Sequence, residues 1–460
     1  MGLLILGVFL ILLAAGVPIA FALGAAGTIG IFFSPGGSDL LSVLPQQVFT
    51  QLDSITLLTI PLFILAGTIM AFGGVADRLM TFAQATVGRG RGGLGIAIVV
   101  SALFFHGISG SSTADTAAIG RVTLPILKKQ GYPVPFSAAL LAAAGATALL
   151  IPPTVDLIIV GIVANISIAG LFAGGVIPAI VNALGLIGWL LFQSRRHGYG
   201  GKAARVAATE TGRTVDGAPA EPAQGSGLEP LDDEAGVITE ILQSFVGAVP
   251  ALFMIVIILG GILGGVFTPT EASVVAVVYG LFVAMVVYRD LKPSMLPRVF
   301  LNSIELAGLV MLVIAMGSIL SYAFTVNQIP DQLAAWIQQV APNKYIFLLL
   351  VQILFFFIGM IMDGVPAELI LMPILTPIAV AYGIQPIHFG ILVVANVGLG
   401  LAHPPVGLCL NTACAVAKIP IEKTIKPLLP FIAIQWVTLL IITYVEGLTM
   451  FLPNLLGLGK

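Results

Sequence analysis

The sequence has few charged residues and no surplus of basic ones. Of its 460 residues, 9% are charged and 58% are hydrophobic, and the mean hydropathy is +1.10. Soluble domains carry about 25% charged residues, so this composition excludes a water-soluble domain and indicates a polytopic protein of the lipid bilayer. The net charge of −2 gives no reason to expect binding to nucleic acid.

Cysteines and catalytic motifs are scarce as well. The two cysteines, Cys409 and Cys414, lie five positions apart, which is about 140° around a helix, so neither a disulfide nor a shared metal ion is expected. The sequence has no HExxH motif and no Walker A loop, and the segment after Gly107 lacks the second glycine of a nucleophile elbow. We therefore expect no enzyme, no organic cofactor and no ATP-driven motor.

Long apolar runs are abundant instead. Stretches long enough to cross a membrane are expected at 54–73, 134–168, 170–193, 246–262, 270–288, 300–325, 387–418 and 427–452. Residues 3–33 form either one long helix or two short helices hinged at Gly16–Pro18. Two helices are preferred, because an inverted repeat then has five spans in each half.

A pattern of glycines and prolines occurs twice, 252 residues apart. The paired positions are Gly107 and Gly359, Pro125 and Pro377, Gly131 and Gly383, Pro152 and Pro404, and Pro153 and Pro405. Each copy has an apolar segment that ends at a polar tip, a returning segment, and a long helix interrupted by Pro-Pro. Duplicated and interrupted segments of this kind are the best sequence indication of a transporter binding site.

We expect an all-α polytopic membrane protein with an inverted repeat that contains two re-entrant helical hairpins and two helices broken at Pro-Pro pairs. Lys and Arg gather in segments that this threading places on one side, which the positive-inside rule makes cytoplasmic, so both termini are expected to be periplasmic. The expected units are scaffold helices with an interfacial arm at 1–92, a first transport half at 93–168 (hairpin 93–129, broken helix 134–168), a scaffold helix at 169–197, a cytoplasmic linker at 198–240, second-repeat scaffold helices with an arm at 241–344, a second transport half at 345–418 (hairpin 345–382, broken helix 387–418) and a C-terminal scaffold helix at 419–460.

The two tips carry the candidate binding residues. At the first tip, Ser109 and Ser111 flank Gly110. Their hydroxyl and carbonyl oxygens suit a small cation, while the start of the returning helix suits an anion; a tightly packed turn is the structural alternative. At the second tip, Asp363 stands at the position equivalent to Ser111. A carboxylate in a membrane segment indicates function, as a sodium ligand or a proton acceptor, with a structural salt bridge as the alternative.

The broken helices are expected to supply the facing half of the site. Proline cannot donate a hydrogen bond to the carbonyls of the turn before it, and Gly145 and Gly398 loosen the same two turns. Asp156 follows the first break, where it either faces the substrate or caps the restarting helix. His403 precedes the second break, where it binds an anion, titrates or packs.

These segments resemble the large membrane subunit of tripartite ATP-independent periplasmic (TRAP) transporters, the DctM-like family. The resemblance extends over nearly the whole chain in the order of the family. The matching segments are Gly107–Ser112, Ile151–Thr154, Phe267–Ala272, Gly359–Asp363, Pro404–Leu408 and Leu429–Phe431.

The resemblance implies an elevator-type transporter of the ion-transporter superfamily in the inner membrane, with both hairpins and both broken helices in the mobile domain. It also implies symport with Na⁺, a small four-helix DctQ-like membrane subunit, and a DctP-like periplasmic binding protein that delivers an organic anion, usually a carboxylate. By the same resemblance, one sodium ion lies between the first tip (Ser109, Ser111) and the first broken helix, a second lies between the second tip (Asp363) and the second broken helix, and the substrate lies near Ser111, Thr154 and Asp363. The sequence adds Gly110, Gly145 and Pro152 as candidates for the first cation site, Gly398 and His403 for the second, and Asp156 for the substrate.

Two residues depart from the family pattern. His403 stands where a threonine is common, and Asp156 stands where an uncharged residue is usual, which puts the second cation site and the choice of substrate in question. No Arg or Lys is expected beside the tips, so a bound anion there would depend on sodium for its charge compensation. The alternatives are a self-sufficient ion-coupled carboxylate carrier or antiporter without a binding protein, and an ion channel or a scaffold subunit without transport of its own.

Overall fold

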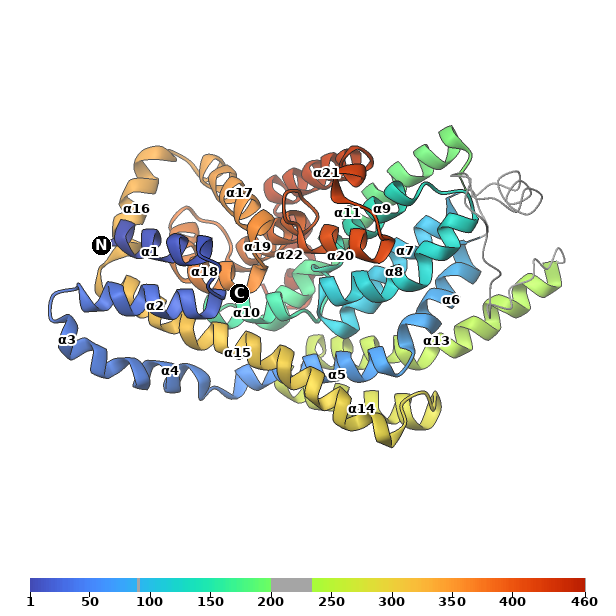
Figure 1. Ribbon diagram of the computed structural model, residues 1–460, viewed down its shortest axis with the longest axis horizontal. Coiled ribbons are helices and arrows are strands. Elements are labelled where there is room, and N and C mark those ends of the chain that lie inside the picture. Colours follow the sequence, from blue (N-terminus) through green and yellow to red (C-terminus); the bar gives the residue numbers. More distant parts are fainter. Residues whose placement is uncertain (89–91, 200–233, 460) are drawn as a thin grey trace.

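The computed structural model describes residues 1–88, 92–199 and 234–459, apart from the side chains of residues 108–109 and 234–238. Every regular element in this described part is a helix (Figure 1), as the sequence predicts. The elements are α1 (Gly2–Ala14), α2 (Ile19–Phe32), α3 (Gly37–Leu40), η1 (Leu41–Val43), α4 (Leu44–Leu52), η2 (Ile55–Leu58), α5 (Thr59–Phe72), α6 (Val75–Val87), α7 (Gly93–Ser109), α8 (Ser112–Lys129), α9 (Val134–Ala148), α10 (Val155–Val163), α11 (Ile168–His197), α13 (Glu234–Leu263), α14 (Pro269–Phe282), η3 (Val283–Val287), η4 (Pro293–Met295), α15 (Leu296–Val326), α16 (Ile329–Val340), α17 (Lys344–Ile361), α18 (Gly364–Ala381), α19 (Pro386–Leu401), α20 (Leu408–Ala417), α21 (Ile421–Tyr444) and α22 (Gly447–Leu455).

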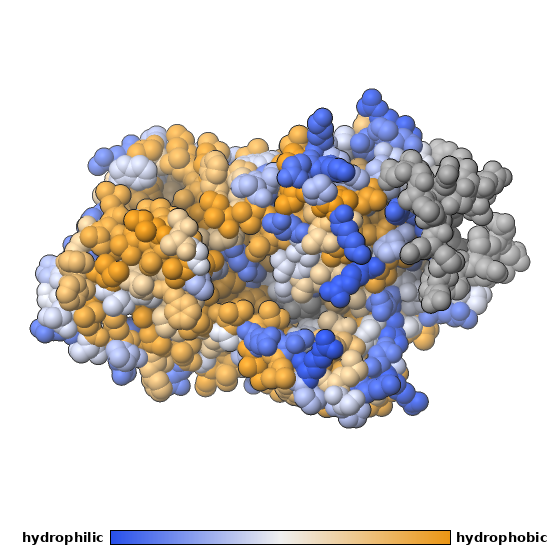
Figure 2. Space-filling model, viewed as in Figure 1, coloured by the Kyte–Doolittle hydropathy of each residue, from blue (hydrophilic) through white to orange (hydrophobic). Residues whose placement is uncertain are grey.

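The described residues contain helices that are long and apolar enough to cross a membrane. Many of their large apolar side chains point outward, as Val278 of α14 and Leu309 of α15 do, and Figure 2 shows broad apolar areas on the face in view. Apolar surface of this extent needs a lipid environment, so the fold is that of a polytopic membrane protein. The eight candidate spans are Ile55–Phe72, Ile168–His197, Thr239–Leu263, Pro269–Val287, Pro293–Val326, Lys344–Ile361, Gly364–Ala381 and Ile421–Tyr444.

The first apolar stretch forms two short helices. Helix α1 ends at Ala14, and two residues later Gly16 has a φ of +80°, a conformation that glycine adopts without strain. The amide of Val17 donates to the carbonyl of Leu12 at 3.0 Å, which closes the helix end in the usual glycine-dependent way. Pro18 then fixes the extended entry into α2, so the hinge lies where the sequence predicts it.

The helix bounds follow the sequence repeat. Shifting the bounds of α8 by 252 residues gives the bounds of α18, and the same shift brings α7, α9 and α10 to within two residues of α17, α19 and α20. Both returning helices also end alike. Gly131 and Gly383 have φ values of +79° and +75°, and the next amide in each donates to a carbonyl five residues back, at 3.1 and 3.0 Å. The two copies thus share local structure as well as sequence.

Helix α9 lies at the centre of the packing. All its residues from Phe136 to Ala148 are buried, because small alanine side chains let α7, α8, α19, α20 and α21 approach it. The side chain of Gln435, on α21, donates to Ala143 O and to Thr147 Oγ1, each at 3.1 Å. These bonds fix α21 against the last turns of α9, just before the first Pro-Pro break.

The helices form two groups that meet near the middle of the molecule. Helix α5 packs against α14 and α15 along one side of the molecule, and α8 packs against α7, α9 and α20 on the other (Figure 1). The groups come together where α5 contacts α7 and α10, and where α15 contacts α18. Most of the expected linker at 198–240 lies outside the described residues, and helix α13 starts at Glu234.

Candidate functional site

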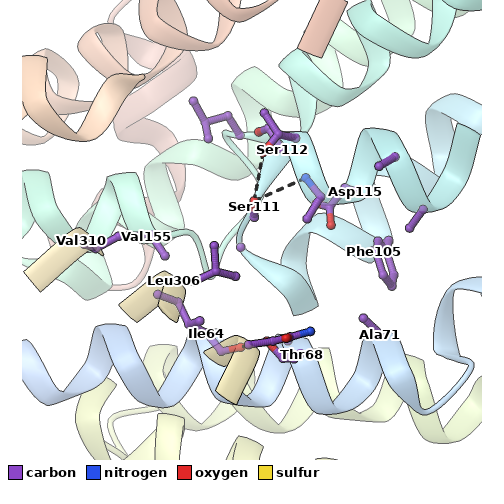
Figure 3. Close-up of a pocket in the computed structure, with 18 of the residues that line it drawn as sticks. Ile64, Thr68, Ala71, Phe105, Ser111, Ser112, Asp115, Val155, Leu306 and Val310 are labelled. Carbon is purple, nitrogen blue, oxygen red and sulfur yellow. Dashed lines mark hydrogen bonds between the residues drawn. The ribbon is translucent and has the colours of Figure 1, made fainter. Parts of the chain in front are cut away.

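A cavity of about 690 Å³ lies between these two groups of helices. Figure 3 shows Ser111 and Ser112 on one side of it, across from Ile64 and Thr68 of α5. Both repeat-related tips reach this one cavity, although they are 252 residues apart in sequence. The described lining residues are Ile64, Gly67, Thr68, Ala71, Phe72, Phe105, Gly110, Ser111, Ser112, Thr113, Ala114, Asp115, Ala117, Ala118, Arg121, Leu149, Val155, Asp156, Arg298, Asn302, Leu306, Val310, Asp363, Val365 and Leu401.

The first tip is a turn between two helices. Helix α7 ends at Ser109, and Gly110 continues in a left-handed conformation with φ of +69°, so its amide closes the helix by donating to His106 O at 2.9 Å. Ser111 then caps α8, with its hydroxyl 3.5 Å from the amide of Ala114. Gly110 and Ser111 both line the cavity, while the side chain of Ser109 lies outside the described residues.

The second tip repeats this design with a carboxylate. Helix α17 ends at Ile361, Met362 is extended, and Asp363 caps α18. Its Oδ1 accepts a hydrogen bond from the amide of Gly364 at 2.8 Å, as negative side chains at a helix N-terminus do. Asp363 therefore occupies the same capping position as Ser111 and lines the same cavity.

Each hairpin touches a broken helix through a glycine. A methyl group on Gly107 would lie 3.0 Å from the carbonyl oxygen of Pro152, so the first tip approaches the first break closely. In the second copy, a methyl group on Gly400 would lie 2.5 Å from the carbonyl carbon of Gly359. The amide of Gly407 also donates to Met360 O at 3.3 Å. The repeated glycines are therefore needed for close contact between backbones.

Asp156 connects the two halves of the site. It lies in the first turn of α10, just beyond the Pro152-Pro153 pair, and it is only 6% exposed. A methyl group on Gly364, the first residue of α18, would lie 2.6 Å from Asp156 Oδ1. The first broken helix thus brings a carboxylate to the second tip, beside Asp363.

Other predicted residues lie behind the lining. Thr154 is buried and caps α10, because its hydroxyl accepts from the amide of Leu157 at 3.2 Å. His403 is buried too, with Nδ1 2.8 Å from Leu399 O and its ring edge-on to Phe356 at 4.6 Å. These contacts give both residues a structural role, and their proposed ligand contacts stay predictions.

The two glycines of the broken helices face neighbouring helices. A methyl group on Gly145 would lie 2.1 Å from Thr116 Oγ1 and 3.5 Å from Ser112 O, so α9 lies directly against the first returning helix. A methyl group on Gly398 would lie 2.7 Å from Ala146 O, where the two broken helices cross. Among the described residues, no three His, Cys, Asp or Glu side chains are grouped to hold a metal ion, so a cation here would need carbonyl or hydroxyl oxygens among its ligands.

The sequence reasoning missed the positive charges of the cavity. Arg121 of α8 and Arg298 of α15 both line it, together with the amide side chain of Asn302. The sequence placed these arginines only in the basic clusters that the positive-inside rule assigns to the cytoplasm, with Arg121 on or after the returning arm of the first hairpin. The sequence does give the distance of Arg121 from the first tip. Arg121 is ten residues beyond Ser111 on the same helix, or about 15 Å along the axis.

The first hairpin also contains a buried polar pair that the sequence reasoning missed. His106 and Asp115 are each completely buried, and His106 Nδ1 lies 2.6 Å from Asp115 Oδ2. The pair joins α7 to α8 just behind the first tip. Because a buried charge is costly without a partner, this contact stabilises the hairpin that presents Ser111.

The comparisons with known proteins agree with this architecture. Residues 6–448 match the family described as tripartite ATP-independent periplasmic transporter, DctM component. The chain is 38% identical over 439 residues to the C4-dicarboxylate TRAP transporter large permease protein DctM of Pseudomonas aeruginosa, which covers 95% of each chain. It is 35% identical over 449 residues to the isethionate TRAP transporter permease protein DctMQ of Oleidesulfovibrio alaskensis, which covers 97% of this chain and 65% of that protein.

A solved structure gives a separate comparison of the fold. The crystal structure of the YdaH transporter of Alcanivorax borkumensis matches with a TM-score of 0.56 and 16% identity, over 93% of this chain and 91% of that one. At this identity the likeness concerns the fold alone. The sequence relatives are named as transporter permeases rather than as enzymes, and the family match covers nearly the whole chain. The chain belongs to the DctM component family of tripartite ATP-independent periplasmic transporters.

Proposed function

We propose that this chain is the sodium-coupled membrane subunit that imports a small organic anion by an elevator mechanism. A carboxylate is the substrate class that we propose first. The observation that carries the proposal is the meeting of both hairpin tips, with Ser111 and Asp363, in one cavity. The two relatives reported above are named for a C4-dicarboxylate and for isethionate. Both are small, oxygen-rich organic anions, which is the substrate class that the proposal adopts.

The tips can bind a cation and an anion together. The hydroxyl of Ser111, the carboxylate of Asp363 and the carbonyls before each Pro-Pro pair provide hard oxygen ligands that suit Na⁺. The amides at the starts of α8 and α18 provide the positive ends of helix dipoles for an anion. Since Asp156 and Asp363 already bring negative charge to the site, sodium bound there would reduce the repulsion of an incoming anion.

The elevator reading is supported by the position of the cavity. One wall is formed by α5 and α15, and the other by both hairpin tips and α10. Small side chains predominate where α5 and α8 line the cavity, with Gly67 and Ala71 on α5 and Ala114 and Ala118 on α8. A boundary of small residues lets one group of helices move along the other with little interlocking of side chains. In this proposal the hairpin group moves and α5, α14 and α15 remain fixed.

The inverted repeat is part of the same proposal. In this proposal the two hairpins, whose tips line one cavity, enter the membrane from opposite sides, as re-entrant segments of two oppositely oriented repeats do. The clusters of Lys and Arg would then face the cytoplasm of a bacterial cell with both termini periplasmic. A DctQ-like small membrane subunit and a DctP-like periplasmic binding protein would complete the transporter, and the joined name DctMQ of the isethionate relative supports the first of these.

The arginines of the cavity are proposed to act at a distance. Arg121 lies about 15 Å along α8 from Ser111, which is too far for one small anion at the tips to contact both residues. Over that distance an arginine stabilises an anion by about 0.3–1 kcal/mol at effective dielectric constants between about 80 and 20. Arg121 and Arg298 would therefore raise the local concentration of anions in the cavity rather than hold the substrate.

The test is uptake into proteoliposomes that contain the chain with its small membrane subunit. Labelled C4-dicarboxylates and isethionate would be supplied through the binding protein, with and without an inward sodium gradient. We expect uptake only with both sodium and binding protein, and its loss in Ser111→Ala and Asp363→Asn. The exposed residues Ser42 and Asp331 provide matched controls, as Ser42→Ala and Asp331→Asn. Uptake without a binding protein, or with a proton gradient alone, would favour the self-sufficient carrier instead.

A further inference from the structure

A further acidic side chain, Glu368, lies behind the cavity lining. Glu368 is on the first turns of α18 and is completely buried. Neither of its carboxyl oxygens has a hydrogen-bond partner among the described residues. A buried polar group without a partner is rare and costly in a folded protein, so this carboxyl group requires a physical explanation.

Glu368 points toward Asp156. A methyl group on Gly364 would lie 3.5 Å from Glu368 Oε1 and 2.6 Å from Asp156 Oδ1. Both oxygens therefore lie near one point and within 6.1 Å of each other, the sum of these two distances. Two negative charges at this separation disfavour the doubly ionised pair by roughly 100-fold at an effective dielectric constant of about 20. Asp363, which accepts from the amide of the same Gly364, adds a third carboxyl group.

The surrounding charges do not compensate the pair directly. The other titratable groups that line the cavity near the pair are Asp363, Asp115, Arg121 and Arg298. His106, the partner of Asp115, and Cys409 are buried and do not line it. The packed helix α5 has no charged residue, α11 has its basic residues in its last turn, and α17 and α19 have Lys344 and His388 at their starts, away from the tips. Glu305 of α15 and Asp331 of α16 are exposed.

We propose that Glu368 and Asp156 form a proton-binding site, in which Glu368 carries the proton and Asp156 keeps the negative charge. The first turn of α10 stabilises a charge on Asp156, whereas the completely buried Glu368 has no such support. A metal ion would need several oxygen ligands, and among the described residues no group of three His, Cys, Asp or Glu side chains is arranged so that it could hold one. A proton needs a single oxygen. The step adds one proton from solvent to a Glu368 oxygen and removes one negative charge from beside the second tip.

The proton is carried by Glu368, which is not among the proposed sodium ligands, and its binding makes transport sensitive to pH. When Glu368 loses its proton at alkaline pH, three negative carboxylates gather around Gly364, and an anionic substrate at the tips is repelled. Uptake by the wild-type protein should therefore decline at alkaline pH. Glu368→Gln, which mimics the protonated form, should show a flatter pH profile, and Glu368→Asp should restore the decline.

The direct test is infrared difference spectroscopy on the purified full chain. We expect a carboxylic-acid carbonyl band at neutral pH that disappears on alkaline titration, that loses about one carboxyl equivalent in Glu368→Gln, and that persists in Asp156→Asn and in Asp363→Asn. The exposed Glu305 provides the matched control, Glu305→Gln, with an unchanged band.

Two results would overturn the proposal. Wild-type protein without any carboxylic-acid band at neutral pH would show that Glu368 is ionised, whether or not the variants fold. A band of wild-type intensity in Glu368→Gln would assign the proton elsewhere. Both readouts are independent of uptake, so a failure of the sodium-coupled function would leave this test intact.

Discussion

The close approach of Gly359 and Gly400 leads to a quantitative prediction for Gly400→Ala. A methyl group at Gly400 would lie 2.5 Å from the carbonyl carbon and 2.6 Å from the Cα of Gly359. Carbon atoms in favourable contact are about 3.5–4.0 Å apart, so α17 and α19 would have to separate by about 1 Å. The clash is between backbones, and no flexible side chain can move to relieve it. Overpacking of this kind costs about 1–3 kcal/mol.

Gly308→Ala is the matched control. Gly308 also lies inside a helix, α15, and no atom of the described residues is within 4 Å of the position that its methyl group would occupy. Both substitutions gain the same helix-propensity term of about 0.5–1 kcal/mol, so their difference isolates the clash of about 1–3 kcal/mol. The assay is the apparent melting temperature of the purified chain, measured at one heating rate because unfolding of large proteins is often irreversible.

We expect Gly400→Ala to melt several degrees below the wild-type protein and Gly308→Ala to melt at or above it. The same clash should also reduce uptake, because α17 and α19 carry the second tip and the second break. If Gly400→Ala melted at the temperature of Gly308→Ala or higher, the backbone contact between the second hairpin and its broken helix would not exist as described.

Two further predictions concern the cavity and the core. Arg121→Gln should raise the apparent KM for an anionic substrate by less than tenfold and should lose its effect at high salt, because the charge acts over about 15 Å; a change of 100-fold, independent of salt, would mean that Arg121 contacts the substrate. Gln435→Leu removes the bonds to Ala143 O and Thr147 Oγ1 and should destabilise the chain by about 0.6–1.7 kcal/mol, the range of polar contacts between membrane helices. Melting of Gln435→Leu at the wild-type temperature would show that these bonds contribute nothing.

The repeat made much of the local structure predictable from sequence. The glycines and prolines at the 252-residue spacing locate both tips, both breaks and the ends of both returning helices, because each of these features depends on a close backbone contact, a backbone conformation or a missing donor that only Gly or Pro supplies. The hinge at Gly16–Pro18 is predictable for the same reason. Ser111 and Asp363 stand out because a polar side chain at the end of an apolar membrane segment needs a partner, either the start of a helix that it caps or a ligand that it binds.

The convergence of distant segments was not predictable. Nothing in the order of residues shows that Asp156 of the first repeat lies beside Gly364 of the second, or that Glu368 points into the same place. Arg121 and Arg298 each stand near other basic residues in the sequence. The positive-inside rule therefore assigns them to the cytoplasmic side, and the sequence gives no sign that they line the cavity. Thr154 was predicted to contact the substrate, whereas in the structure its hydroxyl caps α10. A hydroxyl next to a helix break can serve either role, and the sequence alone does not separate them.

The most direct test of the central claim is equilibrium binding of a labelled C4-dicarboxylate to the purified chain with its small subunit, in sodium buffer and in choline buffer. The account holds that sodium, with Asp363 as one of its ligands, compensates the negative charges of Asp156 and of the bound anion. It predicts saturable binding in sodium that is lost in choline and in Asp363→Asn, with binding retained in Asp331→Asn. Equal affinity in the two buffers would contradict the account.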